Sequence, residues 1–311
     1  MIRFVCAQPA VDYYLWQVEV LINNFIKFGV NPNQIDILLS IKGGIIPDKW
    51  KILQEHYNTV RFFFYEDTRT DLTYIPSVYF NLMKHHLAHH PNLQDEPLFL
   101  MDSDIVLTQP IPTNWESMSF GRTWYLSDTN SYINYDYIIS KGAPVYEGMC
   151  DIFRIDKRIP KLMNSNSGGA QYIVKNTTFD FWHKVEKDSI ELYKWFCEIE
   201  PLYVKKHEGD YPIQKWTAGM WSLLWNAWLE GHETKVDERL NFTWSTNNIS
   251  ELSNNVILHN AGVTKSNKGL FYKGDYINKL PYGLDLTIDK TKCSWFYYEQ
   301  IKETEKVSPI N

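Results

Sequence analysis

Hydrophobic and polar positions follow two different periods along the first hundred residues of the chain. Short apolar runs that are typical of buried strands are separated by longer segments in which apolar residues recur every three or four positions, as in an amphipathic helix. In the first such segment Asp12 is the expected N-cap and Gly29 the expected end. Its apolar face consists of Leu15, Val18, Ile22 and Phe25. The pattern predicts strands over residues 2–7, 35–39, 60–65 and 97–101, and helices over residues 12–29, 49–56 and 77–90.

Alternating strands and helices predict an α/β fold with a mostly parallel, doubly wound central sheet flanked by helices. After residue 104 the pattern predicts short strands over residues 124–126 and 256–258 and long helices over residues 179–197 and 214–229. No linker rich in Pro, Gly or Ser, no block of like charge and no internal repeat divides the chain. We therefore expect a single domain over residues 1–311 with a helical C-terminal elaboration.

The apolar run that ends at Met101 is followed by two aspartates, Asp102 and Asp104. Open α/β sheets bind their ligands at the carboxyl ends of parallel strands. In an extended segment residues i and i+2 point the same way, so both carboxylates can reach one point while Ser103 is directed elsewhere. Two carboxylates on one cation leave coordination positions open for phosphate oxygens, which suits Mg²⁺ or Mn²⁺. The motif therefore predicts a metal site that assists the departure of a phosphate.

The composition narrows the classes of function. A chain of 311 residues that is 44% hydrophobic and 15% aromatic can bury a large core. The formal net charge of −6 and the scattered lysines argue against a nucleic-acid surface. The four cysteines form no CxxC pair, and no apolar stretch approaches the roughly 20 residues of a membrane-spanning helix. The first residues lack the apolar core of a signal peptide, so we expect a cytoplasmic protein.

Glycine-rich phosphate-binding motifs are absent from the sequence. No GxGxxG follows the first predicted strand, and GxxxxGK[ST] does not occur. Bound phosphates would then be held through a metal ion. The segment HHLAHH, residues 85–90, presents histidine pairs at i and i+4, for which a polar helix end is expected and adventitious zinc or nickel binding is the alternative.

Five stretches of the sequence, in a fixed order, resemble a known family. They are FLMDSDIVLTQPI, YLSDTNSYINYDYIISKG, NSNSGGAQYIVKNTTFDFWHKVEKDS, PIQKWTAGMWSLLW, and ILHNAGV followed by FYKGD. The chain resembles DxD-containing, metal-dependent glycosyltransferases of the GT-A fold, and among them viral and bacterial relatives of plant hydroxyproline O-arabinosyltransferases and peptidyl-serine galactosyltransferases. The resemblance implies an enzyme that moves a sugar from a nucleoside diphosphate donor, UDP-linked, to a hydroxyl of a glycan or glycoprotein.

The resemblance also implies which half of the chain binds the donor, which half binds the acceptor, and which residues bind the metal ion. Residues 1–110 would form the nucleotide-sugar-binding half, and residues 111–311 the acceptor-binding half with a C-terminal closing segment. Asp102 and Asp104 match the metal-binding DxD, and His259 resembles the histidine that completes the metal site, which favours Mn²⁺ over Mg²⁺. Lys273, in FYKGD, resembles the lysine that meets the donor diphosphate. The other residues expected to bind the donor are Gln8, Tyr74, Ser77, Ser103, Gly168, Gly169 and Gln171.

Several of these assignments keep a structural alternative. Lys273 also reads as a surface lysine, and His259 as a buried histidine bonded to backbone. Gln8 also fits the cap of a loop. Tyr74 would stack on the nucleotide base. Gly168 and Gly169 would let the backbone approach a sugar, or form a loop before a strand.

The acid or base of the reaction is the least defined part of the resemblance. Relatives carry a carboxylate where the stretch WTAGMW has Gly219. Asp210, in EGDYPIQ, is the nearest replacement, followed by Asp128 and Asp136. Gly219 therefore keeps open a catalytically silent protein that binds nucleotide sugar or glycan. A metal-dependent phosphoesterase is a third alternative, although that class usually clusters more acidic or histidine ligands.

Overall fold

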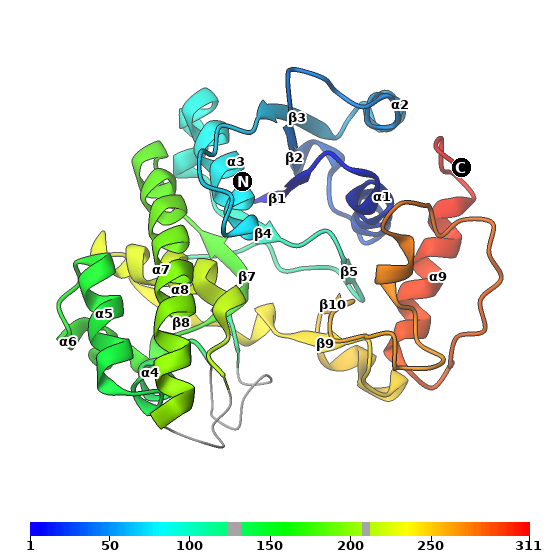
Figure 1. Ribbon diagram of the computed structural model, residues 1–311. Helices are drawn as coiled ribbons and strands as arrows, with labels where there is room; N and C mark the ends of the chain where they lie inside the picture. Colours follow the sequence, from blue (N-terminus) through cyan, green and yellow to red (C-terminus); the bar gives the residue numbers. More distant parts are fainter. Residues whose placement is uncertain (124–131, 207–211) are drawn as a thin grey trace. The chain divides into compact units, whose positions relative to one another are not determined.

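The computed structural model describes residues 1–123, 132–206 and 212–311, which form two compact units (Figure 1). The first unit comprises Met1–Glu66, Leu98–Asn114 and Arg239–Asn311, and the second unit comprises Asp67–Pro97 and Trp115–Glu238. The chain therefore enters the second unit twice and returns to the first unit each time. The predicted single domain over residues 1–311, divided near residue 110, is not tested by this division and stays a prediction.

A parallel sheet forms the centre of the first unit. Its strands lie in the order β3-β2-β1-β4. Their bounds are Arg3–Pro9 (β1), Ile35–Ile41 (β2), Arg61–Glu66 (β3) and Leu98–Met101 (β4). The apolar runs of β1, β2 and β4 are buried almost without interruption, as expected for parallel strands covered on both faces. Helix α1 (Asp12–Lys27) connects β1 to β2, and α2 (Asp48–His56) connects β2 to β3 (Figure 1).

A smaller sheet completes the first unit. Its strands β5 (Ile105–Leu107), β10 (Ile257–His259) and β9 (Phe242–Trp244) lie in the order β5-β10-β9. Strand β10 is antiparallel to β5 and parallel to β9. Helix α9 (Cys293–Glu305) packs against α1, and the two helices share an aromatic core around Trp16, Phe271 and Tyr297.

The second unit combines a short sheet with most of the helices. Strand β7 (Gly169–Val174) is antiparallel to β6 (Met118–Gly121), which pairs in parallel with β8 (Thr234–Val236). The long helix α7 packs against α3, α5 and α8. The helices are α3 (Val78–His89), α4 (Tyr135–Ser140), α5 (Ala143–Phe153), α6 (Arg158–Leu162), α7 (Phe179–Lys206) and α8 (Ala218–Leu229). Short 3₁₀ helices in the two units span Pro32–Gln34, Ile75–Ser77, Pro91–Asp95, Asn164–Asn166, Lys215–Thr217, Glu238–Leu240, Ile249–Asn254 and Lys273–Tyr276.

The α/β fold with a mostly parallel sheet flanked by helices is confirmed. Every element predicted before Asp102 is present, with ends that shift by at most two residues. The prediction that Asp12 caps α1 is wrong. Val11 is the N-cap and provides no side-chain bond, whereas Asp12 is the first helical residue and pairs with Lys49 at 2.8 Å.

The prediction is less complete after Asp104. Helix α7 continues past the predicted end at residue 197 and contains Pro201, which lacks only the one N–H that would bond to the carbonyl four residues back. Helix α8 begins at Ala218 rather than at residue 214, because a 3₁₀ turn precedes it. The predicted strand over residues 124–126 lies outside the described residues. The short elements β5 to β9, α4 to α6 and α9 were not predicted, since three to thirteen residues give little periodic signal.

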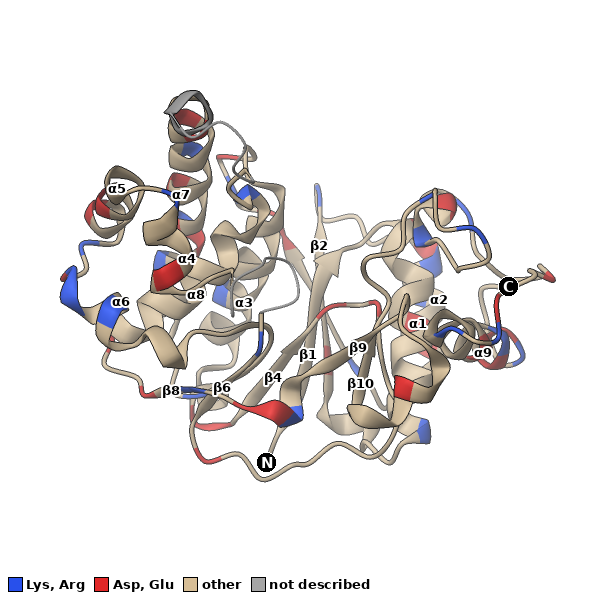
Figure 2. Ribbon diagram, turned by 90° about the horizontal axis from the view of Figure 1, so that it is seen from below, with Lys and Arg blue, Asp and Glu red and all other residues tan. Residues whose placement is uncertain are grey.

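Positively and negatively charged residues are interspersed along α7 and α9 (Figure 2). Neither helix therefore presents a basic stripe of the kind that binds phosphate backbones. Within the described part of the chain, none of the helices has both the length and the apolar character that crossing a membrane requires.

Candidate metal centre

The candidate metal centre lies in the first unit, where β4 ends. Asp102 follows β4 directly, Ser103 and Asp104 form a turn, and β5 begins at Ile105. In the pairing of β5 with β10, His259 lies opposite Ile105, and the N–H of Asn260 donates to the carbonyl of Asp104 at 2.9 Å. The strand register thus carries His259 to the side of Asp104, although the two residues are 155 positions apart.

Two carboxylates and one imidazole converge at this point. His259 Nε2 lies 3.1 Å from Asp104 Oδ1 and 3.6 Å from Asp102 Oδ2, and one ligand atom from each residue lies within 4.8 Å of the others. In the part of the chain that the structure describes, this is the one group of three or more acidic, histidine or cysteine side chains with such spacing. Asp104 and His259 are buried, whereas the Asp102 side chain is 50% exposed. The centre is therefore open to solvent on the side of Asp102.

Aromatic rings from β9 hold the imidazole of His259. Its centroid lies 5.0 Å from Phe242, with the rings edge to face, and 6.5 Å from Trp244, with the rings nearly parallel at 6°. The parallel pairing of β9 with β10 sets this arrangement, because it places Trp244 beside His259. Packing on two faces restricts rotation of the ring and keeps Nε2 directed at the two carboxylates.

Lys273 reaches the same centre from the segment between β10 and α9. Its ammonium forms an ion pair with Asp104 Oδ2. The residues that flank Lys273 are anchored in the core: Phe271 and Tyr276 pack edge to face on Trp16 of α1, with centroids 5.8 and 6.3 Å away. The N–H of Phe271 also donates to Ser294 Oγ at 2.7 Å. The lysine is therefore part of the centre rather than a free surface residue.

The charges of the centre depend on one another. Burial raises the pKa of Asp104, but Lys273 and His259 outweigh it and hold that pKa well below its usual range. Burial likewise opposes a charge on His259 and on Lys273, yet the neighbouring carboxylates raise the pKa of both groups. Asp104 is therefore an anion that two basic groups contact from opposite carboxylate oxygens.

The three clustered side chains fit a divalent cation. His259 Nε2 faces two carboxylate oxygens, and three acceptors in this arrangement require a proton or a metal ion between them. His259 Nδ1 has no hydrogen-bond partner among the described residues, which leaves Nε2 as the nitrogen directed at the centre. Two carboxylates and one imidazole, with one side open to water, suit Mn²⁺ and are compatible with Mg²⁺. Asp102, Asp104 and His259 are thus the residues that would hold the ion.

Two further residues expected to bind the donor lie beside this centre. The Ser103 hydroxyl is buried and donates to Gln17 Oε1 of α1 at 3.1 Å. Gln8 lies at the carboxyl end of β1, opposite Leu39 of β2, and is also buried. The Ser103 hydroxyl is therefore directed at α1, from a turn rather than from the extended segment that the sequence predicted. Gln17 was not predicted as a site residue, because a polar residue inside an amphipathic helix is ordinarily taken as exposed.

Tyr74 and Ser77 belong to the second unit. The Tyr74 hydroxyl donates to the carbonyl of Trp216 at 2.7 Å and accepts from the N–H of Gly219 at 2.9 Å, and its ring packs on Tyr193. Ser77 Oγ donates to the carbonyl of Tyr74 at 2.7 Å. Both side chains are buried and make internal contacts, and their predicted contact with a nucleotide stays a prediction.

Gly168, Gly169 and Gln171 lie at and near the start of β7. A Cβ at Gly168 would meet Gly121 O and Phe120 Cβ at 2.7 Å, and one at Gly169 would meet Met220 Cε. Packing against backbone inside the second unit is therefore enough to require Gly168, whereas the atom nearest to a Cβ at Gly169 is the flexible end of Met220. The Gln171 amide is fully buried, and neither its oxygen nor its nitrogen has a partner among the described residues. An unpaired buried amide is unusual, so Gln171 keeps its place as a ligand-binding candidate.

The candidates for catalysis are described only in part. Asp136 is exposed and accepts a hydrogen bond from Asn164 Nδ2 at 2.7 Å. It lines a polar pocket of about 350 Å³, together with Arg122, Thr123, Asn134, Asn164, Ser165, Ser167 and Val236. Asp128 and Asp210 lie outside the described residues.

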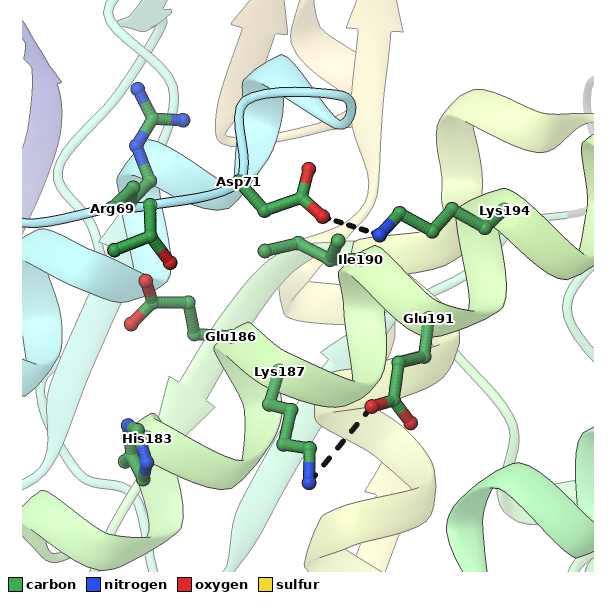
Figure 3. A pocket seen from close by; sticks show the side chains of 9 residues that line it. Arg69, Asp71, His183, Glu186, Lys187, Ile190, Glu191 and Lys194 are labelled. Carbon is green, nitrogen blue, oxygen red and sulfur yellow. Dashed lines mark hydrogen bonds and ion pairs between the residues drawn. The ribbon is translucent and has the colours of Figure 1, made fainter.

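Another pocket of the second unit, of about 230 Å³, lies between α7 and the residues that follow β3 (Figure 3). Two ion pairs lie within it: Lys194 pairs with Asp71, and Lys187 lies 3.9 Å from Glu191 (Figure 3). The buried Glu186 accepts from Lys84, outside the pocket lining, at 2.6 Å. This internal compensation leaves little unbalanced charge for a ligand to bind.

The histidines of the segment HHLAHH are also used internally. His85 Nε2 hydrogen-bonds to Thr68 Oγ1 at 2.8 Å, and His89 Nδ1 to the carbonyl of His85 at 2.8 Å. His86 is fully buried and packs against the His90 ring. The polar helix end that we expected for this segment matches these contacts better than a zinc or nickel site does.

No protein-family model matches the sequence, and no curated protein matches it. The solved structures similar to this chain include three that are glycosyltransferases by name. The first is the bifunctional glycosyltransferase WbbM in its apo form (12% identity, TM-score 0.44, 99% of this chain and 51% of that one). The second is a glycosyltransferase involved in the glycosylation of the major capsid of PBCV-1 (8%, TM-score 0.39, 98% of both chains). The third is GlyE of Streptococcus pneumoniae TIGR4 (12%, TM-score 0.42, 98% of this chain and 64% of that one).

These comparisons differ in how much of each solved chain they cover. This chain spans about half the length of WbbM and less than two thirds of GlyE, but nearly all of the PBCV-1 enzyme. Each of these likenesses is at 12% sequence identity or less.

Proposed function

We propose that this protein is a metal-dependent glycosyltransferase. It would move a sugar from a nucleoside diphosphate donor, UDP-linked, to a hydroxyl of a glycan or glycoprotein. The observation that supports this proposal best is the cluster of Asp102, Asp104 and His259 at the carboxyl end of a parallel strand, with Lys273 in contact. Such a centre has the charges needed to bind a diphosphate through a cation.

The chemistry would divide between the centre and the acceptor. In the transfer, the bond between the anomeric carbon and the diphosphate oxygen breaks, and its electron pair leaves with the diphosphate. A bound cation would neutralise the charge that develops on that leaving group. Lys273 adds a second positive charge next to Asp104. The acceptor oxygen bonds to the anomeric carbon, and its proton passes to a base, for which Asp136, Asp128 and Asp210 are the candidates.

The ligand set indicates the metal, and two buried amides indicate contacts to the donor. An imidazole in the ligand set favours Mn²⁺ over Mg²⁺. Gln171 stays a proposed donor contact because its buried amide has no hydrogen-bond partner among the described residues. Gln8, at the end of β1, supplies a second amide at the end of a parallel strand. The UDP moiety and the glycan acceptor come from the resemblance of the sequence motifs.

A catalytically silent protein that binds nucleotide sugar is the second candidate, and Gly219 favours it. The space beside Gly219 is filled: a Cβ there would meet the Phe80 ring at 2.7 Å. A carboxylate at this position would therefore require the ring to move. A phosphoesterase lacks comparable support, because the described residues contain a single cluster of metal-ligating side chains.

Thermal unfolding in the presence of nucleoside diphosphates and nucleotide sugars, with and without Mn²⁺, tests the proposal without an acceptor. A ligand at 100 times its Kd stabilises the native state by about 2.7 kcal/mol, which raises the midpoint by several degrees. We expect UDP compounds to stabilise the protein only when Mn²⁺ is present, and Asp102→Asn to abolish the effect.

Asp12→Asn is the matched control, since Asp12 is similarly exposed, lies in the same unit and pairs with Lys49 outside the centre. If Asp102→Asn responds to UDP and Mn²⁺ as the wild-type protein does, the donor is not bound through this centre. An activity assay decides between the two candidate functions. Hydrolysis or transfer of the donor by the wild-type protein would show an enzyme rather than a silent binding protein.

A further inference from the structure

Helix α1 carries two buried amides on a side that faces the metal-binding segment. Gln17 is 1% exposed and Asn24 is 2% exposed. They are seven residues apart, which is close to two helical turns, so their side chains project in nearly the same direction. Buried amides in a helix interior are unusual because each needs hydrogen-bond partners. Both amides form hydrogen bonds with residues 103–107.

Gln17 contacts the turn between the two aspartates. Its Nε2 donates to the carbonyl of Tyr13 at 2.6 Å, one turn earlier in α1, and this bond fixes the orientation of the amide. Its Oε1 is thereby left to accept the Ser103 hydroxyl at 3.1 Å. Ser103 stands between Asp102 and Asp104, so the bond ties the turn that carries both carboxylates to α1.

Asn24 contacts the strand that follows the turn. The N–H of Leu107 donates to Asn24 Oδ1 at 2.6 Å, and Asn24 Nδ2 donates to the carbonyl of Leu107 at 3.1 Å. Strand β5 is an edge strand, and the N–H of the next residue, Thr108, donates to Val256 just before β10. Asn24 therefore satisfies the backbone of Leu107 on the side where β5 has no neighbouring strand. Its Nδ2 also donates to Gln300 of α9 at 3.2 Å.

The distance between the two amides along α1 matches the length of the segment that they contact. Seven residues of α-helix rise about 10 Å, and the four steps from Ser103 to Leu107 would span about 13 Å if fully extended and less with a turn at Asp104. One amide can therefore hold each end of the segment without distorting α1. Asp104 lies between the two contacts and is held from the opposite side by Asn260 N–H.

We infer that Gln17 and Asn24 are positioning residues for the metal centre, a role that rests on the proposed function. Asp102 and Asp104 carry like charges at one point and repel each other before a cation binds. Hydrogen bonds from neutral amides restrain the segment against this repulsion without adding charge to the centre. Their effect is on geometry, and they correspond to the outer partners that orient metal ligands in other proteins.

Mn²⁺ affinity of the metal-free protein, measured by calorimetry or by the paramagnetic resonance of free Mn²⁺, tests the inference. Loss of an outer partner typically weakens metal binding 10- to 100-fold. We expect Gln17→Leu and Asn24→Leu to weaken Mn²⁺ binding by a factor in that range. Asn23→Leu is the matched control, because Asn23 is the next residue of α1 and bonds to Tyr57 and to the carbonyl of Glu19, away from the segment.

Ser103 supplies a second comparison with a small change in volume. Ser103→Ala removes the hydroxyl that Gln17 accepts and should behave like Gln17→Leu. Hydrogen exchange of the amides of residues 103–107 in the metal-free protein should accelerate in Gln17→Leu and Asn24→Leu and not in Asn23→Leu. This readout also applies if a variant is too unstable for calorimetry.

Three outcomes count against the inference. Wild-type Mn²⁺ affinity in folded Gln17→Leu and Asn24→Leu overturns it, and so does an equal loss of affinity in Asn23→Leu, which would reflect general stability. A wild-type protein that does not bind Mn²⁺ overturns the metal centre itself, and the positioning role with it. The first two results leave the proposed function standing, so the two failures are distinguishable.

Discussion

At the scale of single residues, Lys273 is the side chain whose role the structure changes most. The sequence leaves it as either a ligand of the diphosphate or a surface lysine, whereas the structure pairs its ammonium with Asp104. In the metal-free protein Lys273 therefore supplies part of the positive charge that a cation would otherwise bring to Asp104. This arrangement links the segment between β10 and α9 to the state of the metal centre.

Replacing Lys273 with Met should destabilise the metal-free protein by about 1–3 kcal/mol, because Asp104 would remain buried with less compensation. Saturating Mn²⁺ should reduce this loss, since the ion would neutralise Asp104. Urea unfolding with and without Mn²⁺ measures both values. Lys27→Met removes an exposed pair with Glu303 in the same unit and should cost no more than about 1 kcal/mol in either condition. If Lys273→Met loses the same unfolding free energy with and without Mn²⁺, the ion does not replace the Lys273 ammonium as the charge partner of Asp104.

Close packing around Gly219 leaves no room for a side chain at this position. A Cβ at this position would lie 2.7 Å from Phe80 Cζ and 3.0 Å from the Tyr74 hydroxyl. Gly219→Ala should therefore destabilise the protein by about 1–3 kcal/mol, the usual cost of overpacking, and Gly219→Asp should gain no activity. Denaturant unfolding and a donor-hydrolysis assay check the two statements. Phe80→Leu combined with Gly219→Ala should recover part of the loss, and wild-type stability in Gly219→Ala alone would show that the Phe80 ring yields readily.

At the scale of elements, the sequence predicts best where one periodicity runs without interruption. The strands and helices from β1 to β4 are each a regular apolar pattern bounded by turn residues, and all of them are present. Strands such as β5, β9 and β10 have only three residues each. Strand β5 is placed by its pairing with β10, about 150 residues further along the chain, which no local pattern encodes. The burial of polar residues on α1 depends in the same way on what the helix packs against.

The residues of the candidate site also divide into those that a local pattern predicts and those that depend on distant segments. Asp102 and Asp104 are evident from the sequence because a strand and its end are local features. His259 and Lys273 were assigned through the resemblance, since nothing local brings β10 or FYKGD to the end of β4. Gln17 and Asn24 were missed. Their spacing of seven residues in a helix that is otherwise largely apolar is the signal that indicates a second buried side.

Glu19 is a third buried polar residue of α1, and it connects the helix to the C-terminal segment. Its Oε2 accepts from the Tyr282 hydroxyl at 2.7 Å and from Ser308 Oγ at 3.0 Å. Burial raises the pKa of Glu19 from 4.5 to about 7, although these hydrogen bonds act in the opposite direction. Between pH 4.5 and pH 7 the native state therefore retains a proton that the unfolded chain has lost. The stability that Glu19 contributes is complete below this range and is lost as the pH rises through 7.

Glu19→Gln should remove this pH dependence. Between pH 5 and pH 8 the unfolding free energy of the wild-type protein should fall relative to that of the variant, by at most about 3 kcal/mol for a shift of this size. Denaturant unfolding of both proteins across this range gives the difference. Glu303→Gln, at an exposed position of α9, should run parallel to the wild type. Parallel curves for Glu19→Gln as well would mean that Glu19 ionises normally in the native protein.

At the scale of the whole molecule, the proposed metal ligands come from two distant parts of the chain but from one unit. Asp102 and Asp104 lie in Leu98–Asn114, whereas His259 and Lys273 lie in Arg239–Asn311. The chain leaves the first unit after Asn114 and returns to it at Arg239, so the unit forms the centre only when both segments have packed together. Binding of a cation would therefore stabilise the packing of these two separate segments of sequence in the first unit.

Mn²⁺ alone should consequently act on the first unit. Hydrogen exchange followed by mass spectrometry should slow in residues 98–107 and 255–276 when Mn²⁺ is added, because opening of either segment would release the ion. Exchange in the α7 residues 179–202 should change little, since no proposed ligand lies in the second unit. Asp104→Asn should remove the protection in both segments of the first unit. Equal protection of α7 in the wild-type protein would instead place Mn²⁺ on residues of the second unit, which would contradict the centre formed by Asp102, Asp104 and His259.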